Sequence, residues 1–163
     1  MDSVDEMIRA WGVSRPELDA SPLEVVGRLL LCARHLEQAL VEALKPLGLS
    51  YGDFDVVNTL RRLGRQTNPR ELARSSLITS GAMTARLDRL AGAGLIERAP
   101  DPADRRGVLI SLTAEGTRLA DQALDAVLGA DETFLRPLDD DERTAAAGLL
   151  KRLLAPCDAK VDG

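Results

Sequence analysis

Apolar residues recur along most of this chain at the three- to four-residue spacing of amphipathic helices, and they alternate at only one place. The spacing predicts helices over residues 3–11, 22–44, 50–63, 69–75, 80–91, 114–135 and 139–154. Val108, Ile110 and Leu112 stand at every second position, which predicts a strand, and residues 95–98 are expected to form its partner. The fold class is therefore mainly α with a small β-hairpin.

Capping residues and helix breakers set the expected ends of these elements. Ser3, with Glu6 three residues later, predicts a capping box at the start of the first helix, which Gly12 would end. Ser50 is expected to cap the third helix. Residues 99–107 are rich in proline and charge, so they are expected to form the loop at the tip of the hairpin.

The second predicted helix has an apolar surface that is too broad for a single neighbour in a small domain. Its apolar residues are Val25, Val26, Leu29, Leu30, Ala33, Leu36, Leu40 and Leu44. Such a surface is best explained by burial against a second subunit as well as against the chain's own core. We therefore expect a homodimer.

The order of the middle elements is three helices followed by strand, loop and strand, which is the order of a winged helix-turn-helix. Residues 69–75 and 80–91, joined by a tight turn at 76–78, would form the helix-turn-helix, and the hairpin would form the wing. We expect one domain over residues 1–163, with the winged helix-turn-helix at 47–113.

Composition excludes several other classes of protein. Apolar residues make up 45% and charged residues 29% of the chain, as in globular proteins that build their own core. We expect no membrane span, because no uncharged apolar run approaches 18 residues, and the acidic N-terminus lacks the features of a secretory signal. Cys32 and Cys157 show no CxxC spacing, which excludes a zinc ribbon and a disulfide framework. A reduced, cytoplasmic protein is expected.

The charge is unevenly distributed along the chain. The whole chain carries a net charge of −5, but residues 61–118 hold eleven arginines and six acidic residues, a net charge of +5, so the remainder carries −10. A basic middle between acidic flanks indicates a localised site for a polyanion such as double-stranded DNA. An ordinary solvated face is the alternative explanation.

The last helix before the hairpin combines one apolar stripe with an outward face that suits DNA. Met83, Leu87 and Leu90 lie at i, i+4 and i+7 and are expected to face the core. Small residues opposite them would let the helix backbone approach a duplex, and Arg89 supplies a long donor for phosphate or guanine. Arg86 lies on the flank, where a contact inside the protein is expected. The predicted DNA contacts of this helix are Ser80, Gly81, Ala82, Thr84, Ala85 and Arg89.

The expected hairpin tip supplies a second group of DNA contacts. Arg105 and Arg106 are adjacent, and an arginine pair on a loop can enter a narrow minor groove, where the negative potential is deepest. Asp104 precedes them and is expected to orient one guanidinium. A turn that is charged without contacting DNA is the alternative.

These residues together resemble the MarR-type transcriptional regulators over residues 22–155. The resemblance rests on Leu72-Ala73, on the run Ser80-Gly81-Ala82-Met83-Thr84-Ala85-Arg86-Leu87-Asp88-Arg89-Leu90, on Gly94-Leu95-Ile96-Glu97-Arg98, on Asp101-Pro102-Ala103-Asp104-Arg105-Arg106, and on Leu112-Thr113-Ala114-Glu115-Gly116. It implies a homodimer in which residues 1–46 and 114–163 form interleaved dimerisation helices. Each subunit would place one winged helix in successive major grooves of a pseudo-palindromic operator.

A finer resemblance links the chain to the urate-responsive, PecS-like branch of that family. Members add an N-terminal helix with a tryptophan and a following Arg-Pro stretch, which Trp11 and Arg15-Pro16-Glu17-Leu18-Asp19 match. The resemblance implies an effector site formed by Trp11, Asp55, Arg86 and Arg98, with no cofactor. In this interpretation Trp11 stacks on a purine-like ring, Arg86 binds its negative charge, and the anion perturbs an Asp55–Arg98 charge pair. The structural alternatives are a hydrophobic plug for Trp11 and an ion-pair network for the charges.

Other functions fit the sequence less well. An enzyme is not expected, because His35 is the only histidine and no phosphate loop, catalytic triad or metal-ligand cluster is apparent. A redox-sensing repressor that uses Cys32 stays an alternative, although an inert buried thiol is the expectation for a cysteine on an apolar helix. A repressor released by a different phenolic or carboxylate ligand is a further alternative. A protein-interaction module would leave the arginine-rich middle and the wing unexplained.

Overall fold

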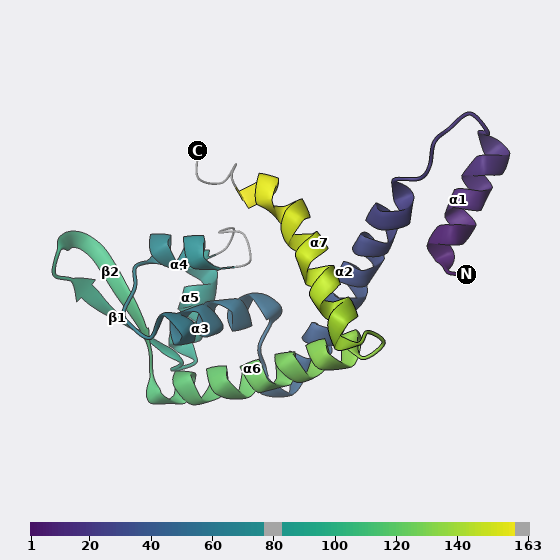
Figure 1. Ribbon diagram of the computed structural model, residues 1–163. Coiled ribbons are helices and arrows are strands. Elements are labelled where there is room, and N and C mark those ends of the chain that lie inside the picture. Colours follow the sequence, from purple (N-terminus) through teal and green to yellow (C-terminus); the bar gives the residue numbers. More distant parts are fainter. Residues whose placement is uncertain (77–82, 159–163) are drawn as a thin grey trace.

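The computed structural model describes residues 1–76 and 83–158, and of Arg105 and Asp158 it describes the backbone only (Figure 1). The elements in chain order are α1 (Ser3–Ser14), α2 (Leu23–Leu44), the 3-10 helix η1 (Lys45–Leu47), α3 (Tyr51–Leu63), α4 (Pro69–Ser75), α5 (Met83–Gly92), β1 (Ile96–Asp101), β2 (Asp104–Leu112), α6 (Ala114–Leu135) and α7 (Asp140–Asp158). The predicted fold class, mainly helical with one antiparallel hairpin, is confirmed.

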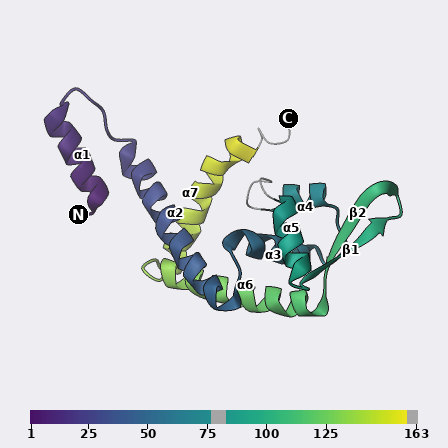
Figure 2. The same ribbon diagram turned by 180° about the vertical axis from the view of Figure 1, so that it is seen from behind.

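Two groups of elements lie at opposite ends of α6. Helices α3, α4 and α5 and the hairpin gather at its N-terminal end, while α7 leaves its C-terminal end (Figure 1). Helix α2 packs on α6, and α1 lies outermost, beside the N-terminal half of α2, as the reverse view also shows (Figure 2). None of the helices in the described parts of the chain is long and apolar enough to cross a membrane.

The hydrophobic core lies almost entirely in the first of these groups. Its buried residues are Leu40, Leu44, Leu49, Phe54, Val56, Val57, Leu60, Leu72, Met83, Leu87, Leu90, Leu95, Ile96, Ile110, Ala120, Ala123 and Val127. They come from the C-terminal half of α2, from α3 to α5, from the hairpin, and from α6 up to Val127. The winged helix-turn-helix elements therefore pack directly on the two long helices, which form a single support for them.

Three of the predicted helix starts are confirmed by cap geometry. The Ser50 hydroxyl accepts a hydrogen bond from the backbone N–H of Asp53 at 3.1 Å, and the Asn68 side chain caps α4 in the same way. The Thr113 hydroxyl accepts from the N–H of Gly116 at 3.0 Å at the start of α6. These side chains satisfy backbone donors that have no partner within the helix.

Both ends of α1 and the C-terminal end of α7 differ from the predicted boundaries. Helix α1 is capped by Asp2 rather than Ser3, because Asp2 and Asp5 exchange side-chain and backbone hydrogen bonds, so the capping box lies one residue earlier than predicted. Helix α1 also passes Gly12 and ends at Ser14, and α7 continues to Asp158. A glycine costs only about 1 kcal/mol within a helix, so it does not by itself end one.

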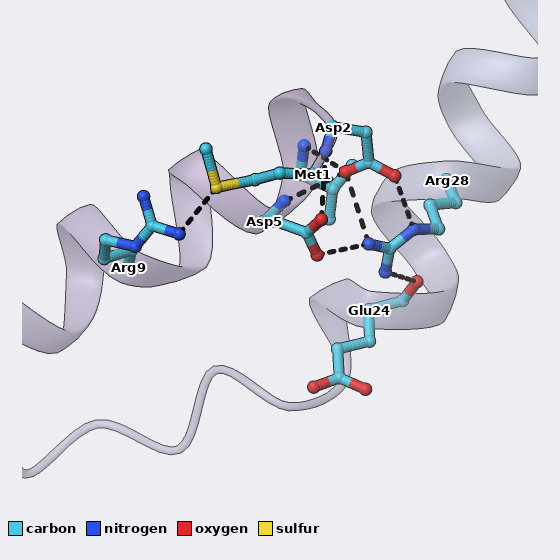
Figure 3. Close-up of polar contacts among 7 residues, drawn as sticks. Met1, Asp2, Asp5, Arg9, Glu24 and Arg28 are labelled. Carbon is cyan, nitrogen blue, oxygen red and sulfur yellow. Dashed lines mark hydrogen bonds and ion pairs between the residues drawn. The ribbon is translucent and has the colours of Figure 1, made fainter.

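An ion-pair cluster and one apolar contact attach α1 to α2. Val4 is fully buried against Gly27, whose missing side chain leaves the space that Val4 fills. Beside it, the Arg28 guanidinium donates to Asp2 at 2.9 and 3.2 Å and to Asp5 at 2.5 Å (Figure 3). The backbone N–H of Asp5 and the guanidinium hold the pKa of Asp2 below its usual value. Helix α1 is therefore anchored by its first turn.

Replacing Gly116 with alanine should destabilise the protein by about 2 kcal/mol, because overpacking against backbone forces the structure to shift. A Cβ at Gly116 would lie only 1.8 Å from the carbonyl oxygen of Leu95, where α6 starts against β1. Gly129→Ala in the same helix is the matched control, since nothing lies within 4 Å of a Cβ there. The control should stabilise by about 0.5–1 kcal/mol. Thermal unfolding of both variants measures the difference, and equal effects would contradict the predicted contact.

Glutamate 71 should make stability depend on pH in the acid range. Arg65 and the Thr67 hydroxyl donate to its carboxylate and lower its pKa from 4.5 to about 2. Because the folded-state pKa is depressed, this contribution to stability is present above pH 4.5 and is lost as pH falls toward 2. Glu71→Gln should therefore reduce the dependence on pH of the free energy of unfolding between pH 4.5 and 2, as measured by urea unfolding. A pH profile of Glu71→Gln identical to that of the parent would contradict this prediction.

Candidate nucleic-acid interface and effector site

Helix α5 presents the two faces that its sequence predicted. Met83, Leu87 and Leu90 are buried in the core, whereas Thr84 and Ala85 are exposed. The predicted contacts Ser80, Gly81 and Ala82 lie outside the described residues. The face proposed for DNA is thus directed away from the core wherever the structure describes it.

Arg89 has a partner inside the protein that sequence reasoning missed. Its Nη2 donates to Oδ1 of Asp53 in the first turn of α3 at 2.8 Å. The side chain of Asp53 is 12% exposed and that of Arg89 is 56% exposed. One end of the guanidinium is therefore held by α3 while more than half of the arginine side chain faces solvent.

The wing is a longer hairpin than predicted. Strands β1 and β2 pair antiparallel from Ile96 opposite Leu112 to Pro100 opposite Val108. Only Pro102 and Ala103 form the turn between the strands. Strand pairing therefore continues through most of the segment that was expected to be a loop.

The longer pairing changes the setting of the predicted wing residues. Asp104, Arg105 and Arg106 belong to β2 rather than to a loop at the tip. Oδ1 of Asp104 accepts the backbone N–H of Arg106 at 2.9 Å, so Asp104 stabilises the turn, whereas the sequence predicted that it orients a guanidinium. Arg106 is exposed. The two arginines therefore stand on a hydrogen-bonded strand, which limits their backbone freedom.

A single backbone bridge ties the wing to the helices. Thr67 and Ile110 exchange backbone hydrogen bonds of 3.0 and 2.8 Å, and both residues are buried. Thr67 lies two residues before α4, so the bridge joins the start of the helix-turn-helix to the C-terminal part of β2. The wing and α4 consequently hold a fixed position relative to each other.

Two of the predicted effector residues lie where α3 meets α5. Asp55 is 3% exposed within α3. The Arg86 guanidinium occupies the space above Gly52, since a Cβ at Gly52 would lie 2.6–2.7 Å from three of its atoms. Gly52 and Asp55 are three residues apart and share one face of α3. Arg86 therefore makes the contact inside the protein that its flanking position predicted.

Arg98 forms an ion pair that the sequence did not predict. Nη2 of Arg98 in β1 donates to Oδ1 of Asp88 in α5 at 2.7 Å. The expected partner was Asp55, which lies on α3. Because β1 follows α5 through the short turn at Ala93 and Gly94, a pair between these neighbouring elements needs little chain length.

Trp11 does not join the other three residues within one subunit. It is 41% exposed on α1, which lies at the end of the molecule opposite α3 and α5 (Figures 1 and 2). The contact of Val4 with Gly27 holds α1 against the N-terminal half of α2, and this docking sets the separation. The predicted four-residue site is not assembled by a single chain.

Cys32 lines an apolar cavity of about 440 Å³ between α2, α6 and α7. It is exposed, so the expectation of a buried thiol was wrong for the single subunit. Asp131 lies in the same lining, and burial raises the pKa of its carboxyl.

Comparisons with known proteins agree with this architecture. A model of the MarR family matches residues 49–108. The transcriptional regulator PecS of Dickeya dadantii is 33% identical over 152 residues, which cover 92% of each chain. The multiple antibiotic resistance protein MarR of Escherichia coli K12 is 35% identical over 132 residues, which cover 79% of this chain and 90% of MarR.

Solved structures give the same result. A Cys-to-Ser mutant of Escherichia coli MarR complexed with operator DNA matches with a TM-score of 0.72 and 31% identity, covering 84% of this chain and 99% of that chain. BpsR of Bordetella bronchiseptica, whose DNA binding is regulated by 6-hydroxynicotinic acid, matches with a TM-score of 0.72 and 25% identity, covering 80% and 94%. The chain therefore belongs to the MarR family of winged helix-turn-helix, DNA-binding transcriptional regulators.

Proposed function

We propose that this protein is a ligand-responsive repressor that binds a pseudo-palindromic operator as a homodimer. The observation that carries the proposal is the winged helix-turn-helix itself, with the outward face of α5 and the arginines of β2 in its basic segment. The DNA-binding set comprises Ser80, Gly81, Ala82, Thr84, Ala85, Arg89, Asp104, Arg105 and Arg106, with α5 in the major groove and the wing in the minor groove.

Exposed apolar side chains support the homodimer. They gather on α2, on the C-terminal half of α6 and on α7: Val25, Val26, Leu29, Leu30, Leu128, Leu135, Leu149, Leu150, Leu153 and Leu154. Scattered single apolar residues are normal on a surface, but a set of this size on neighbouring helices marks an interaction site. A second copy that interleaves its own helices would bury the same set on both subunits.

The proposed effector is a small anionic aromatic molecule such as urate, bound by Trp11, Asp55, Arg86 and Arg98. Arg86 supplies positive charge at the junction of α3 and α5, next to the DNA-binding face. The similarity to PecS over nearly the whole chain favours the urate-responsive branch. Since α1 lies far from this junction within one subunit, the site requires that dimerisation bring Trp11 of one subunit to the arginines of the other.

The first test is binding to the DNA upstream of the protein's own gene. A mobility-shift titration should show a sequence-specific complex of one dimer with two half-sites about 10 bp apart, weakening steeply as salt rises. Scrambled DNA of the same length is the control. A complex of equal affinity on both DNAs would contradict the proposed operator, and a monomeric complex would contradict the homodimer.

Release by oxidation through Cys32 is the second candidate, because the thiol is exposed in the cavity between α2, α6 and α7. We expect Cys32→Ser to bind and release DNA like the parent, because reactive cysteines lie in electropositive surroundings and the described residues lining this cavity include no Lys, Arg or His. The measurement is operator binding before and after peroxide treatment, with Cys157→Ser as the matched control. Loss of peroxide-induced release in Cys32→Ser alone would favour the redox mechanism.

A further inference from the structure

We propose that Asp53 is a positioning residue for DNA binding, which orients the Arg89 guanidinium toward a DNA phosphate. The inference rests on the proposed operator binding and adds to it a residue that lies outside the DNA-binding face. Asp53 occupies the first turn of α3, and its carboxylate reaches across to α5. A positioning residue acts through another side chain, so its effect should depend on Arg89.

Arg89 is held by Asp53 but keeps N–H donors for a further partner. A guanidinium has five N–H donors. Asp53 takes one of them at 2.8 Å, and the carbonyl of Ala85 takes a second at the long distance of 3.4 Å. The remaining donors belong to a side chain that is more than half exposed. Arg89 can therefore donate to a phosphate while its ion pair with Asp53 persists.

Asp53 itself is firmly placed. Its backbone N–H is bound by the Ser50 hydroxyl at the helix cap, and its side chain is mostly buried. An arginine side chain that is held before binding loses less rotamer entropy when it contacts DNA. The buried carboxylate therefore restricts the Arg89 side chain before it binds DNA.

Two arginines of α5 contact the first turn of α3. The Arg86 guanidinium lies above Gly52, directly before Asp53 in sequence, and Arg86 and Arg89 are one turn apart on α5. The two contacts set how α5 lies against α3. Arg86 belongs to the proposed effector site. A shift of Arg86 caused by a bound ligand would therefore also affect Arg89 through the first turn of α3.

Three variants test the role of Asp53 in the full-length protein. Asp53→Ala removes the acceptor, Asp53→Asn keeps an acceptor of the same shape without its charge, and Arg89→Ala removes the donor. Asp121→Ala is the matched control, because Asp121 forms a similar ion pair with Arg61 at 2.7 Å across α3 and α6, away from α5. Operator affinity is measured at several salt concentrations, and circular dichroism checks that each variant is folded.

Asp53→Ala should weaken operator binding by about 10-fold or more, Asp53→Asn should restore part of the loss, and Asp121→Ala should bind like the parent. The slope of log affinity against log salt should become shallower by up to about 2 in both Asp53→Ala and Arg89→Ala, because each dimer loses two phosphate contacts. Combined with Arg89→Ala, the Asp53→Ala change should add nothing.

Other results would overturn the inference. Tighter binding by Asp53→Ala would show that the carboxylate withholds Arg89 from DNA or repels the phosphates. An unchanged salt slope would show that Asp53 only supports the fold. If the parent protein itself does not bind the operator, the proposed function is wrong. If the parent binds and Asp53→Ala binds equally well, only this inference is wrong.

Discussion

Replacing both Arg105 and Arg106 with alanine should lower operator affinity by roughly 1,000-fold at moderate salt, because each dimer loses four cations at the wing. Both residues stand on β2, beside a turn that Asp104 stabilises by accepting the backbone N–H of Arg106. The backbone bridge from Thr67 to Ile110 fixes the hairpin against the helices, so the backbone that carries the two arginines is already in position for the proposed contact with the minor groove.

Mobility shifts at a series of salt concentrations measure this effect. The slope of log affinity against log salt should become shallower by about 3 to 4 in the double variant, since each phosphate contact contributes about 0.9. Arg136→Ala is the control, because Arg136 caps the end of α6 that lies away from the hairpin (Figure 1). Undiminished binding by the double variant would remove the wing from the proposed interface.

Urate should lower the affinity of the protein for the operator about a hundredfold, and it should quench the fluorescence of Trp11 at the same concentrations. A hundredfold change needs about 2.7 kcal/mol of differential binding, which one or two charge-assisted contacts supply. Arg86 lies between α3 and α5, so an anion bound there acts directly on the helix proposed to enter the major groove. Binding would favour a pose of α5 that no longer fits the operator.

Titration of urate into the protein–operator complex tests this prediction, with fluorescence read in parallel. Trp11 is the only tryptophan, so the signal has a single source. Arg86→Ala should abolish both quenching and release while the dimer stays intact, and the uncharged purine hypoxanthine serves as the control ligand. Unaltered responses in Trp11→Phe and Arg86→Ala would rule out the proposed pocket. Release by another anion with urate inert would keep the repressor and change its ligand.

Local features of the sequence determined most of the secondary structure and the fold class. Helix starts at Ser50, Asn68 and Thr113 were predictable because a cap is made by a side chain within three residues of the backbone it serves. The buried stripe of Met83, Leu87 and Leu90 followed from helical periodicity alone. The length of the wing was not predictable, because antiparallel pairing continued through proline and charged residues that are typical of loops.

Ion pairs between elements were decided only by the tertiary structure. The sequence identified Arg89 and Arg98 as important charges, but it could not show that Asp53, 36 residues from Arg89, or Asp88 would be their partners. Several acidic residues lie at comparable distances along the chain, and differences between alternative surface pairs are small, so packing of α3, α5 and β1 selects among them. Likewise, the docking of Val4 against Gly27 places Trp11 far from Arg86 within one subunit, because a contact between two helices depends on shapes that neither helix encodes alone.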